Sequence, residues 1–298
     1  MMPFVNVNLT PNGGQGFCNP TWHHHPELSG NTIKDKFYSP EAELIRDSID
    51  DGSYKYCKDS CPWLKTDREG GSSIYFSELD IEPAPMSLDL CRDRSCNLAC
   101  PTCRDDFITD QVEPFDEIEE IKDSIVFIST SGVGDPLYSK PTREYLKSIN
   151  NIKYPSLKNV QIHTNAMLIK KHWEEIVHLR PQLSISIDAA DKETYEVVRR
   201  GGNWDLLIEN LNFLNEQDTA PIWLWFVVQQ KNYHQIVKFF DLMESIFTKK
   251  DPMYRFFKVE HWGQSGYMEQ SMIDNQSLQA QKTELQEHIK TGKIVWNI

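Results

Sequence analysis

Three cysteines, Cys96, Cys100 and Cys103, stand close together with the spacing C-x3-C-x2-C. Three thiolates at this spacing can bind three irons of a cubane cluster and leave the fourth iron without a protein ligand. A structural zinc site is the alternative, because zinc also accepts thiolates but usually takes four protein ligands. Cys91 precedes the motif and could be that fourth ligand. The cysteines alone therefore leave iron and zinc open.

All seven cysteines of the chain lie within its first 103 residues. Buried structural cysteines would be scattered through the core, so the one-sided placement indicates sites. In a reducing compartment, clustered cysteines indicate metal binding or catalysis rather than disulfides. Four cysteines remain outside the motif: Cys18, Cys57, Cys61 and Cys91.

The elements that must position the motif begin at about residue 85, where short apolar runs alternate with amphipathic stretches. The runs predicted as strands are 86–90, 125–129, 160–163, 183–187, 222–228 and 256–259. Helices are predicted over 115–122, 142–149, 173–179, 204–214 and 236–247. Strands that alternate with helices in this way predict an α/β fold with a parallel sheet, open or curled into a barrel.

Residues 1 to about 70 are rich in loops and end at the polar run 66–73, which indicates a linker. Residues 4–9 alternate like a strand, and the turn residues at 11–14 predict a hairpin whose second strand runs through Phe17 and Cys18. Ser39 before Pro40 predicts a capped helix start.

Candidate binding residues fall where the predicted strands end, which is where ligands bind in parallel β/α folds. The cysteine motif follows the first strand, and Gly134-Asp135-Pro136 follows the second. Glycine lets a backbone approach a ligand closely. Ser186 and Asp188 alternate on one face of the fourth strand.

In this order the motifs over residues 85–265 resemble those of the radical S-adenosylmethionine (SAM) superfamily, whose signature is often Cys-Asn-Leu-x-Cys-Pro-x-Cys. The resemblance implies a partial (β/α)6 barrel at 85–265 and a 4Fe–4S cluster on Cys96, Cys100 and Cys103. In that family the open iron binds the amino and carboxylate groups of SAM. One electron then splits SAM into methionine and a 5′-deoxyadenosyl radical, which abstracts hydrogen from a substrate.

The resemblance also implies which residues contact SAM. The segment at Gly134, Asp135 and Pro136 is similar to the family's Gly-Gly-Glu-Pro, with Val133 at the first glycine and Asp135 in place of the glutamate. The other implied contacts are Ser186 and Asp188 to the ribose, Arg199 or Arg200 to the carboxylate, and Asn232 near the adenosine. Residues 164–166 resemble the family's Thr-Asn-Gly with alanine in place of glycine, and no ligand role is assigned to them. His163 is expected to be a packed or hydrogen-bonded histidine.

Residues 1–72 resemble half of an auxiliary-cluster module, SPASM or its shorter form twitch, which in most relatives follows the barrel rather than preceding it. The resemblance implies a second 4Fe–4S cluster on Cys18, Cys57 and Cys61. Cys91 either completes the four ligands or remains a buried thiol. The usual cysteine before the hairpin is absent, and a zinc ion in the same four thiolates is the alternative. The three consecutive histidines at 23–25 are expected to form a polar loop.

Composition limits the function classes. The formal net charge of −13 disfavours broad nucleic-acid binding, because an acidic protein repels phosphate backbones. The N-terminus lacks the features of a signal peptide, and no apolar stretch is long enough to span a bilayer, so a cytoplasmic protein is expected. Residues 266–298 are expected to form a C-terminal helical tail.

The expected partners are SAM, a reducing electron donor such as flavodoxin or ferredoxin, and a substrate. A peptide is favoured over a small molecule as the substrate, because such modules are common in peptide-modifying relatives. Two other protein classes remain open: a zinc-stapled binding protein without catalysis, and an iron–sulfur electron-transfer protein without a SAM pocket.

Overall fold

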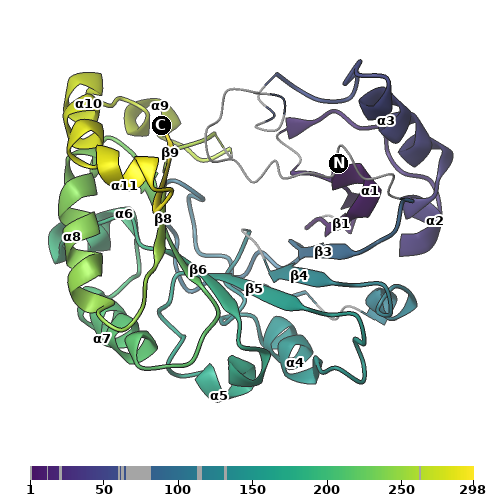
Figure 1. The fold of residues 1–298 in the computed structure, drawn as a ribbon, viewed down its shortest axis with the longest axis horizontal. Coiled ribbons are helices and arrows are strands. Elements are labelled where there is room, and N and C mark those ends of the chain that lie inside the picture. The colour runs from purple at the N-terminus through teal and green to yellow at the C-terminus, as the bar shows by residue number, and fades with distance from the viewer. Residues whose placement is uncertain are drawn as a thin grey trace. The chain divides into compact units, whose positions relative to one another are not determined.

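The computed structural model describes residues 2–298 apart from 12, 20–21, 60, 62–63, 65–81, 113–115, 131–132 and 262. The predicted linker at 66–73 lies outside the described residues. The chain has an α/β fold with a parallel sheet, as predicted (Figure 1). No helix in the described part of the chain is both long enough and apolar enough to cross a membrane. The chain forms two compact units, each built from discontinuous segments.

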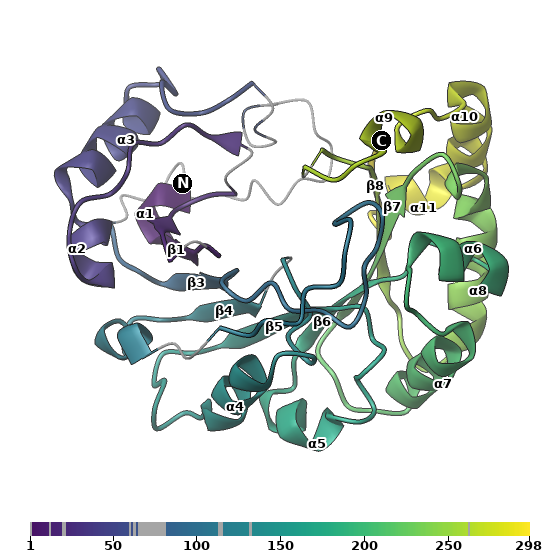
Figure 2. The ribbon, with the colours of Figure 1, turned by 180° about the vertical axis from the view of Figure 1, so that it is seen from behind.

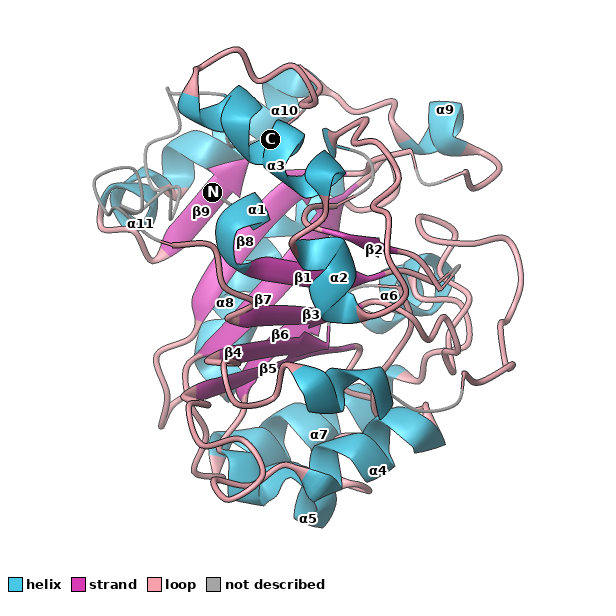
Figure 3. Cartoon of the chain, turned by 90° about the vertical axis from the view of Figure 1, so that its right-hand side faces the viewer, coloured by secondary structure: helices cyan, strands magenta, loops and turns pink. Residues whose placement is uncertain are grey.

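The first unit comprises residues 1–93, 112–133 and 147–161. Its strands are β1 (Asn6–Leu9), β2 (Gln15–Gly16), β3 (Ser87–Leu90) and β4 (Phe127–Thr130). Its helices are α1 (Met2–Val5), α2 (Ile33–Phe37), α3 (Pro40–Asp50) and the 3-10 helix Asp116–Glu120. β1 pairs antiparallel with β2 and parallel with β3, and β3 pairs parallel with β4 (Figure 3).

The predicted hairpin is present, but its second strand is Gln15–Gly16 and ends before Phe17 and Cys18, which were predicted to lie in it. Residues 2–5 form one helical turn, so the first strand begins at Asn6, and the turn closes with the Gly13 amide donating to the Thr10 carbonyl. The predicted helix start is confirmed, because Ser39 Oγ accepts a hydrogen bond from the Ala42 amide at 3.3 Å.

The second unit comprises residues 94–111, 134–146 and 162–298. Its parallel strands lie in the order β6 (Gln182–Ser186), β7 (Ile222–Val228), β8 (Met253–Lys258) and β9 (Ile294–Asn297). Its helical segments are α5 (Trp173–Ile176), the 3-10 helix Val177–Leu179, α6 (Lys192–Val198), α7 (Trp204–Asn215), the 3-10 helix Tyr233–Gln235, α8 (Ile236–Ile246), α9 (Tyr267–Gln270), α10 (Asn275–Glu284) and α11 (Gln286–Lys290). β5 (Asn159–Thr164) and α4 (Lys140–Ser148) each have residues in both units.

The core of the second unit lies between its strands and the helices α7 and α8, which run along the same face of β6, β7 and β8 (Figures 1 and 2). β7 alternates between buried and half-buried residues, with Leu224 and Phe226 fully buried. The ring of Phe226 packs on Phe239 of α8 at a centroid distance of 5.0 Å. The opposite face of β7 carries half-buried residues such as Trp223 and Trp225.

All six predicted strands of the α/β region are present, with ends shifted by up to a few residues. The helix predicted over 115–122 is a 3-10 helix at Asp116–Glu120, and residue 115 lies outside the described residues. The purely helical tail predicted at 266–298 is wrong at its end, where β9 pairs in parallel with β8. By pairing with β8, β9 satisfies the backbone N–H and C=O groups that β8 would otherwise expose at the sheet edge, and its residue Ile294 is buried.

The compact units also differ from the predicted division near residues 72–85. β3 and β4 belong to the first unit, because β1 pairs along the whole length of β3. A functional division into an auxiliary-cluster part at 1–72 and a catalytic part at 85–265 stays a prediction.

Candidate active site

Backbone hydrogen bonds fix the loop that carries Cys96, Cys100 and Cys103 in the second unit. The Cys96 amide donates to the Ile108 carbonyl, and the Cys103 amide donates to the Cys100 carbonyl, both at 2.9 Å. The Ala99 amide donates to the Arg200 carbonyl at the same distance. Cys96 and Cys100 are buried, and Cys103 is half-buried. The loop is therefore held by contacts on both sides of the motif.

Each of the three thiols has a nitrogen donor from another residue beside it. Asn165 Nδ2 lies 3.7 Å from Cys96 Sγ, and Arg199 Nη1 lies 3.7 Å from Cys100 Sγ. Arg104 places Nη2 at 3.3 Å and Nε at 3.4 Å from Cys103 Sγ. Within the described residues, no three His, Cys, Asp or Glu side chains are gathered closely enough to hold a metal ion.

Burial disfavours the thiolate form of two of the thiols. Burial, with a smaller contribution from the Asp135 charge, raises the pKa of Cys96 to about 12. Burial also raises the pKa of Cys100, and the nearby Arg199 charge opposes this. A thiolate-binding metal must therefore displace protons here, and the cationic donors favour the thiolate form.

Asp135 ties three segments of the second unit together. Its amide donates to the Ser95 carbonyl, next to Cys96, at 2.9 Å. Its Oδ2 accepts from Thr164 Oγ1 at 2.9 Å and from the Asn165 amide at 2.8 Å, where β5 ends. The Asp135 side chain is buried, so its role is to position Thr164 and Asn165 by these hydrogen bonds. Gly134 is half-buried and Pro136 is buried in the same loop, whose residues 131–132 lie outside the described part.

Asp188 and Arg199 form an ion pair, with 2.6 Å between Oδ2 and Nη2. Asp188 has a φ of +64°, which a non-glycine residue rarely adopts, and its Oδ1 accepts from the Val227 amide at 2.7 Å. Burial alone would lower the pKa of Arg199, but the Asp188 charge outweighs it and holds the pKa above its ordinary range. Arg199 Nε has no hydrogen-bond partner among the described residues, so the guanidinium keeps an unused buried donor.

The turn after α6 places Arg199. The Gly202 amide donates to the Arg199 carbonyl at 2.7 Å. A Cβ at Gly202 would lie 2.7 Å from Tyr195 Cε1, so only glycine fits this close approach. The tight turn at Gly202 therefore fixes the backbone of Arg199 at the end of α6.

Two further predicted residues, Asn232 and Ser186, form hydrogen bonds within the chain. Asn232 donates to the carbonyls of Asp188 at 2.8 Å and Val227 at 2.9 Å, so it positions Asp188, and its contact to a nucleoside stays a prediction. Ser186, the last residue of β6, lies with Oγ 2.8 Å from His163 Nε2. His163 is thus a hydrogen-bonded histidine, and burial lowers its pKa to about 4.

The remaining cysteines lie in the first unit. Burial raises the pKa of Cys18 to about 12. Cys57 lies in an isolated antiparallel bridge with His23. The Cys91 amide donates to the Leu9 carbonyl at 3.1 Å, directly after β3. Its role as a fourth ligand stays a prediction.

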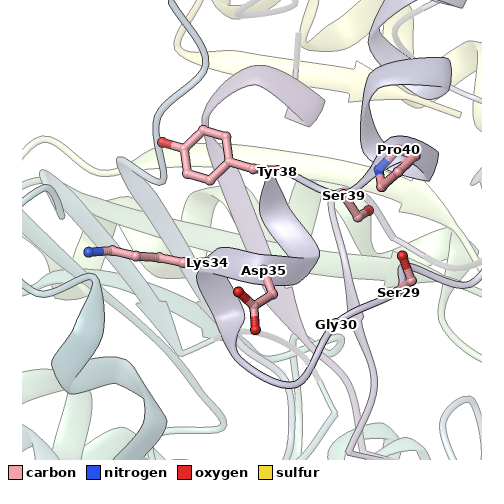
Figure 4. A pocket seen from close by; sticks show the side chains of 7 residues that line it. All are labelled: Ser29, Gly30, Lys34, Asp35, Tyr38, Ser39 and Pro40. Atoms are coloured by element: carbon pink, nitrogen blue, oxygen red, sulfur yellow. The ribbon is translucent and has the colours of Figure 1, made fainter.

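Sequence reasoning missed Asn165 and Arg104, the donors to Cys96 and Cys103. The Thr-Asn pair at the end of β5 and an arginine directly after the motif were the available signals. A shallow pocket between α2 and the start of α3 in the first unit brings in none of these residues (Figure 4). It is lined by Ser29, Gly30, Lys34, Asp35, Tyr38, Ser39 and Pro40.

Known proteins resemble this chain in sequence and in fold. It is 27% identical over 204 residues to the GTP 3′,8-cyclase of Alkaliphilus metalliredigens, covering 62% of this chain and 60% of that protein. It is 28% identical over 142 residues to a probable GTP 3′,8-cyclase of Methanococcus aeolicus, covering 45% and 47%. Streptococcus suis SuiB bound to precursor peptide SuiA shares the fold, with a TM-score of 0.54 and 17% identity over 91% of this chain and 55% of SuiB.

The chain thus spans 60% and 47% of the length of these two curated relatives and 55% of the length of SuiB. A family model matches residues 93–243, which include the cysteine motif, Asp135, Asp188 and Arg199. The family match and the relatives' names indicate an enzyme. Because the matched region covers half of the chain and contains the strand-end residues described above, the chain belongs to the radical SAM superfamily.

Proposed function

We propose that the protein is an enzyme that cleaves SAM reductively and uses the resulting radical to abstract hydrogen from a substrate. The superfamily implies a 4Fe–4S cluster with SAM. The observation that carries the proposal is that each thiol of the C-x3-C-x2-C loop has its own nitrogen donor, from Asn165, Arg199 and Arg104. Such donors fit the thiolates of an iron–sulfur cluster, whose potential depends on hydrogen bonds to sulfur.

In this proposal Cys96, Cys100 and Cys103 hold the cluster, which when reduced supplies the electron that cleaves SAM. Arg199 has an unused buried N–H and is the candidate partner of the SAM carboxylate. Asp188 orients that guanidinium through their ion pair and, with Ser186, is a candidate for the ribose hydroxyls. Gly134 and its loop are the candidate contacts for the methionine amino group, and Asp135 fixes that loop to Ser95.

We extend the proposal to an auxiliary cluster in the first unit. Cys18, Cys57 and Cys61 all belong to the first unit, and the isolated bridge between His23 and Cys57 fixes the loop of Cys57. Cys91 is the candidate fourth ligand. The twitch-like character of residues 1–72 remains part of the proposal.

A peptide is the first candidate substrate and a small molecule the second. SuiB, which shares the fold of this chain, is bound to a precursor peptide in its crystal structure. The name of the curated relatives makes GTP the small molecule to test. A flavodoxin or ferredoxin is the proposed electron donor.

Anaerobic reconstitution tests the proposal. The protein should bind about eight irons per chain if it holds two 4Fe–4S clusters. With dithionite it should convert SAM into 5′-deoxyadenosine and methionine. Cys100→Ala should abolish this cleavage, whereas Cys18→Ala should retain it and lose about four irons.

The Arg199→Lys variant tests SAM binding separately from cluster assembly. It should keep the iron content and raise the KM for SAM, because lysine keeps the charge but loses the planar donor geometry. A protein that carries stoichiometric zinc after oxygen-free purification, or that is reduced without cleaving SAM, would contradict the proposal.

A further inference from the structure

Arg104, the residue directly after the cysteine motif, directs its guanidinium at the sulfur of Cys103. Its Nη2 lies 3.3 Å and its Nε 3.4 Å from Cys103 Sγ, so two of its three guanidinium nitrogens donate to one sulfur atom. Arg104 is only 8% exposed, so this contact lies largely out of water. A hydrogen bond from a cation is stronger there than at the surface, because the local dielectric constant is low.

The guanidinium is held in place from both ends of the motif. Arg104 Nη1 donates to the Arg94 carbonyl at 2.6 Å, and the Arg104 amide donates to the Cys100 carbonyl at 3.0 Å. All three guanidinium nitrogens thus have a partner within residues 94–104. The side chain leaves Cys103 only if these hydrogen bonds break, so its charge stays beside that sulfur.

The other two sulfurs of the motif have longer contacts to side-chain donors. Cys96 Sγ lies 3.7 Å from Asn165 Nδ2, which belongs to a neutral amide. Cys100 Sγ lies 3.7 Å from Arg199 Nη1, but Arg199 shares its charge with Asp188 in an ion pair of 2.6 Å. Among the described residues, the third cysteine of the motif is therefore the one whose sulfur has the shortest contacts to a cation.

A cation at this place acts on the reduction step in one direction. The cluster of the proposed function becomes more negative when it takes up one electron. A positive charge held against one of its sulfur ligands stabilises the more negative state more strongly than the less negative one. Hydrogen bonds to cluster sulfurs also set the reduction potential, and those from a cation add to the same effect. Both contributions raise the potential.

We propose that Arg104 is a positioning residue that raises the reduction potential of the cluster through the sulfur of Cys103. The inference rests on the proposed function, because it takes Cys103 as a ligand of the 4Fe–4S cluster. It adds which side chain makes that cluster easier to reduce, and hence how strong a reductant the electron donor must be. The alternative is a purely structural role, in which Arg104 closes the loop through Arg94.

A potentiometric titration of the reconstituted full-length protein without SAM tests the inference, with electron paramagnetic resonance as the readout. The signal that is lost in Cys100→Ala belongs to this cluster and separates it from an auxiliary cluster. Arg104→Gln removes the charge. Its midpoint potential should be lower than that of the wild type by about 59 mV, a tenfold change in the equilibrium constant of a one-electron reduction, with unchanged iron content.

Two further variants separate charge from structure. Arg104→Lys keeps the charge but loses the planar set of donors, so its potential should lie closer to the wild type than to Arg104→Gln. Arg180→Gln is the charge-matched control in the same unit, because Arg180 is exposed and pairs with Asp218 at 2.9 Å. Arg180 precedes the start of β6, whereas the site residues follow strand ends. Its exposed charge is screened, so this variant should keep the wild-type potential.

Three results would overturn the inference: an unchanged potential in Arg104→Gln, an equal fall in Arg180→Gln, or a loss of about four irons in Arg104→Gln, which would assign Arg104 to cluster assembly. Equal potentials of Arg104→Lys and Arg104→Gln would also contradict it. SAM cleavage by the wild type is measured in the same series. Normal cleavage with an unchanged potential in Arg104→Gln sinks only this inference, whereas a potential that depends on Arg104 without any SAM cleavage sinks only the proposed function.

Discussion

The backbone conformation of Ala166 positions the neighbouring Asn165 beside Cys96. Ala166 is fully buried at the end of β5 and has a φ of +62°, at the position where relatives are expected to have glycine. Its amide donates to Thr164 Oγ1 at 3.1 Å, and its carbonyl accepts from Asn210 Nδ2 at 2.8 Å. These bonds hold the left-handed conformation that directs Asn165 toward Cys96.

Ala166→Gly tests that strain. The change removes a buried methyl, which costs roughly 0.8 kcal/mol, but relieves a left-handed conformation that costs roughly 1–2 kcal/mol. The unfolding free energy should therefore stay within about 1 kcal/mol of the wild type. Ala42→Gly in α3 loses a buried methyl without any such relief and should cost about 1–2 kcal/mol. Equal losses in urea unfolding would contradict the strain at Ala166.

His163 is expected to make the unfolding free energy of the protein depend on pH. It is bonded to Ser186, its ring lies 4.6 Å from that of Trp225, and the charges of Arg199 and Arg255 act on it. Burial first, and then these two cations, lower its pKa from 6.5 to about 4. The unfolded chain therefore binds more protons between these values, so this contribution to stability is present above pH 6.5 and is lost as the pH falls toward 4.

His163→Gln should remove that pH dependence. Between pH 7 and pH 4.5 the unfolding free energy of the wild type should fall more than that of the variant, by up to about 3 kcal/mol. Urea unfolding at both pH values measures the difference. Parallel pH profiles for the two proteins would show that His163 titrates normally.

At the scale of elements, α6 connects the sheet to the ion pair. Its N-cap Asp191 accepts from the Thr194 amide at 3.0 Å and also from Gln235 Nε2 at 2.8 Å, and Arg199 is its C-cap. Because α6 is short, the cap at Asp191 also helps to fix Arg199, whose guanidinium lies beside Cys100.

Asp191→Ala should lower the unfolding free energy by about 1 kcal/mol and raise the KM for SAM, because both ends of α6 loosen. Asp191→Asn keeps a capping oxygen and should recover most of the loss. Asn203→Ala is the control, since Asn203 caps α7 by accepting from the Leu206 amide at 2.9 Å. It should cost similar stability without changing the KM, and an equal KM effect would contradict a role for α6.

At the scale of the whole molecule, the two groups of cysteines belong to different compact units. The C-x3-C-x2-C loop lies in the second unit, with its nitrogen donors. Cys18, Cys57 and Cys61 lie in the first unit. The proposed sites therefore have separate sets of supporting contacts.

Cys18→Ser and Cys100→Ser should consequently act independently. Each should lose about four irons per chain, and the double variant should lose nearly all iron, because sites without shared partners respond additively. Iron analysis and electron paramagnetic resonance of reduced samples measure this. Loss of both signals from one replacement would show that the clusters assemble together.

The order of the six strands and the spacing of the cysteine motif followed from the sequence alone, because apolar periodicity and the spacing of neighbouring residues are local. The cap at Ser39 and the hairpin near Gly13 were predictable for the same reason. Only the tertiary structure decided that Asp188 pairs with Arg199, that Asn165 reaches Cys96, and that β9 covers the edge of β8. It also aligned Asn8 with Asp89, since register brings together residues far apart in the chain. These contacts depend on how distant segments pack, which no local pattern specifies.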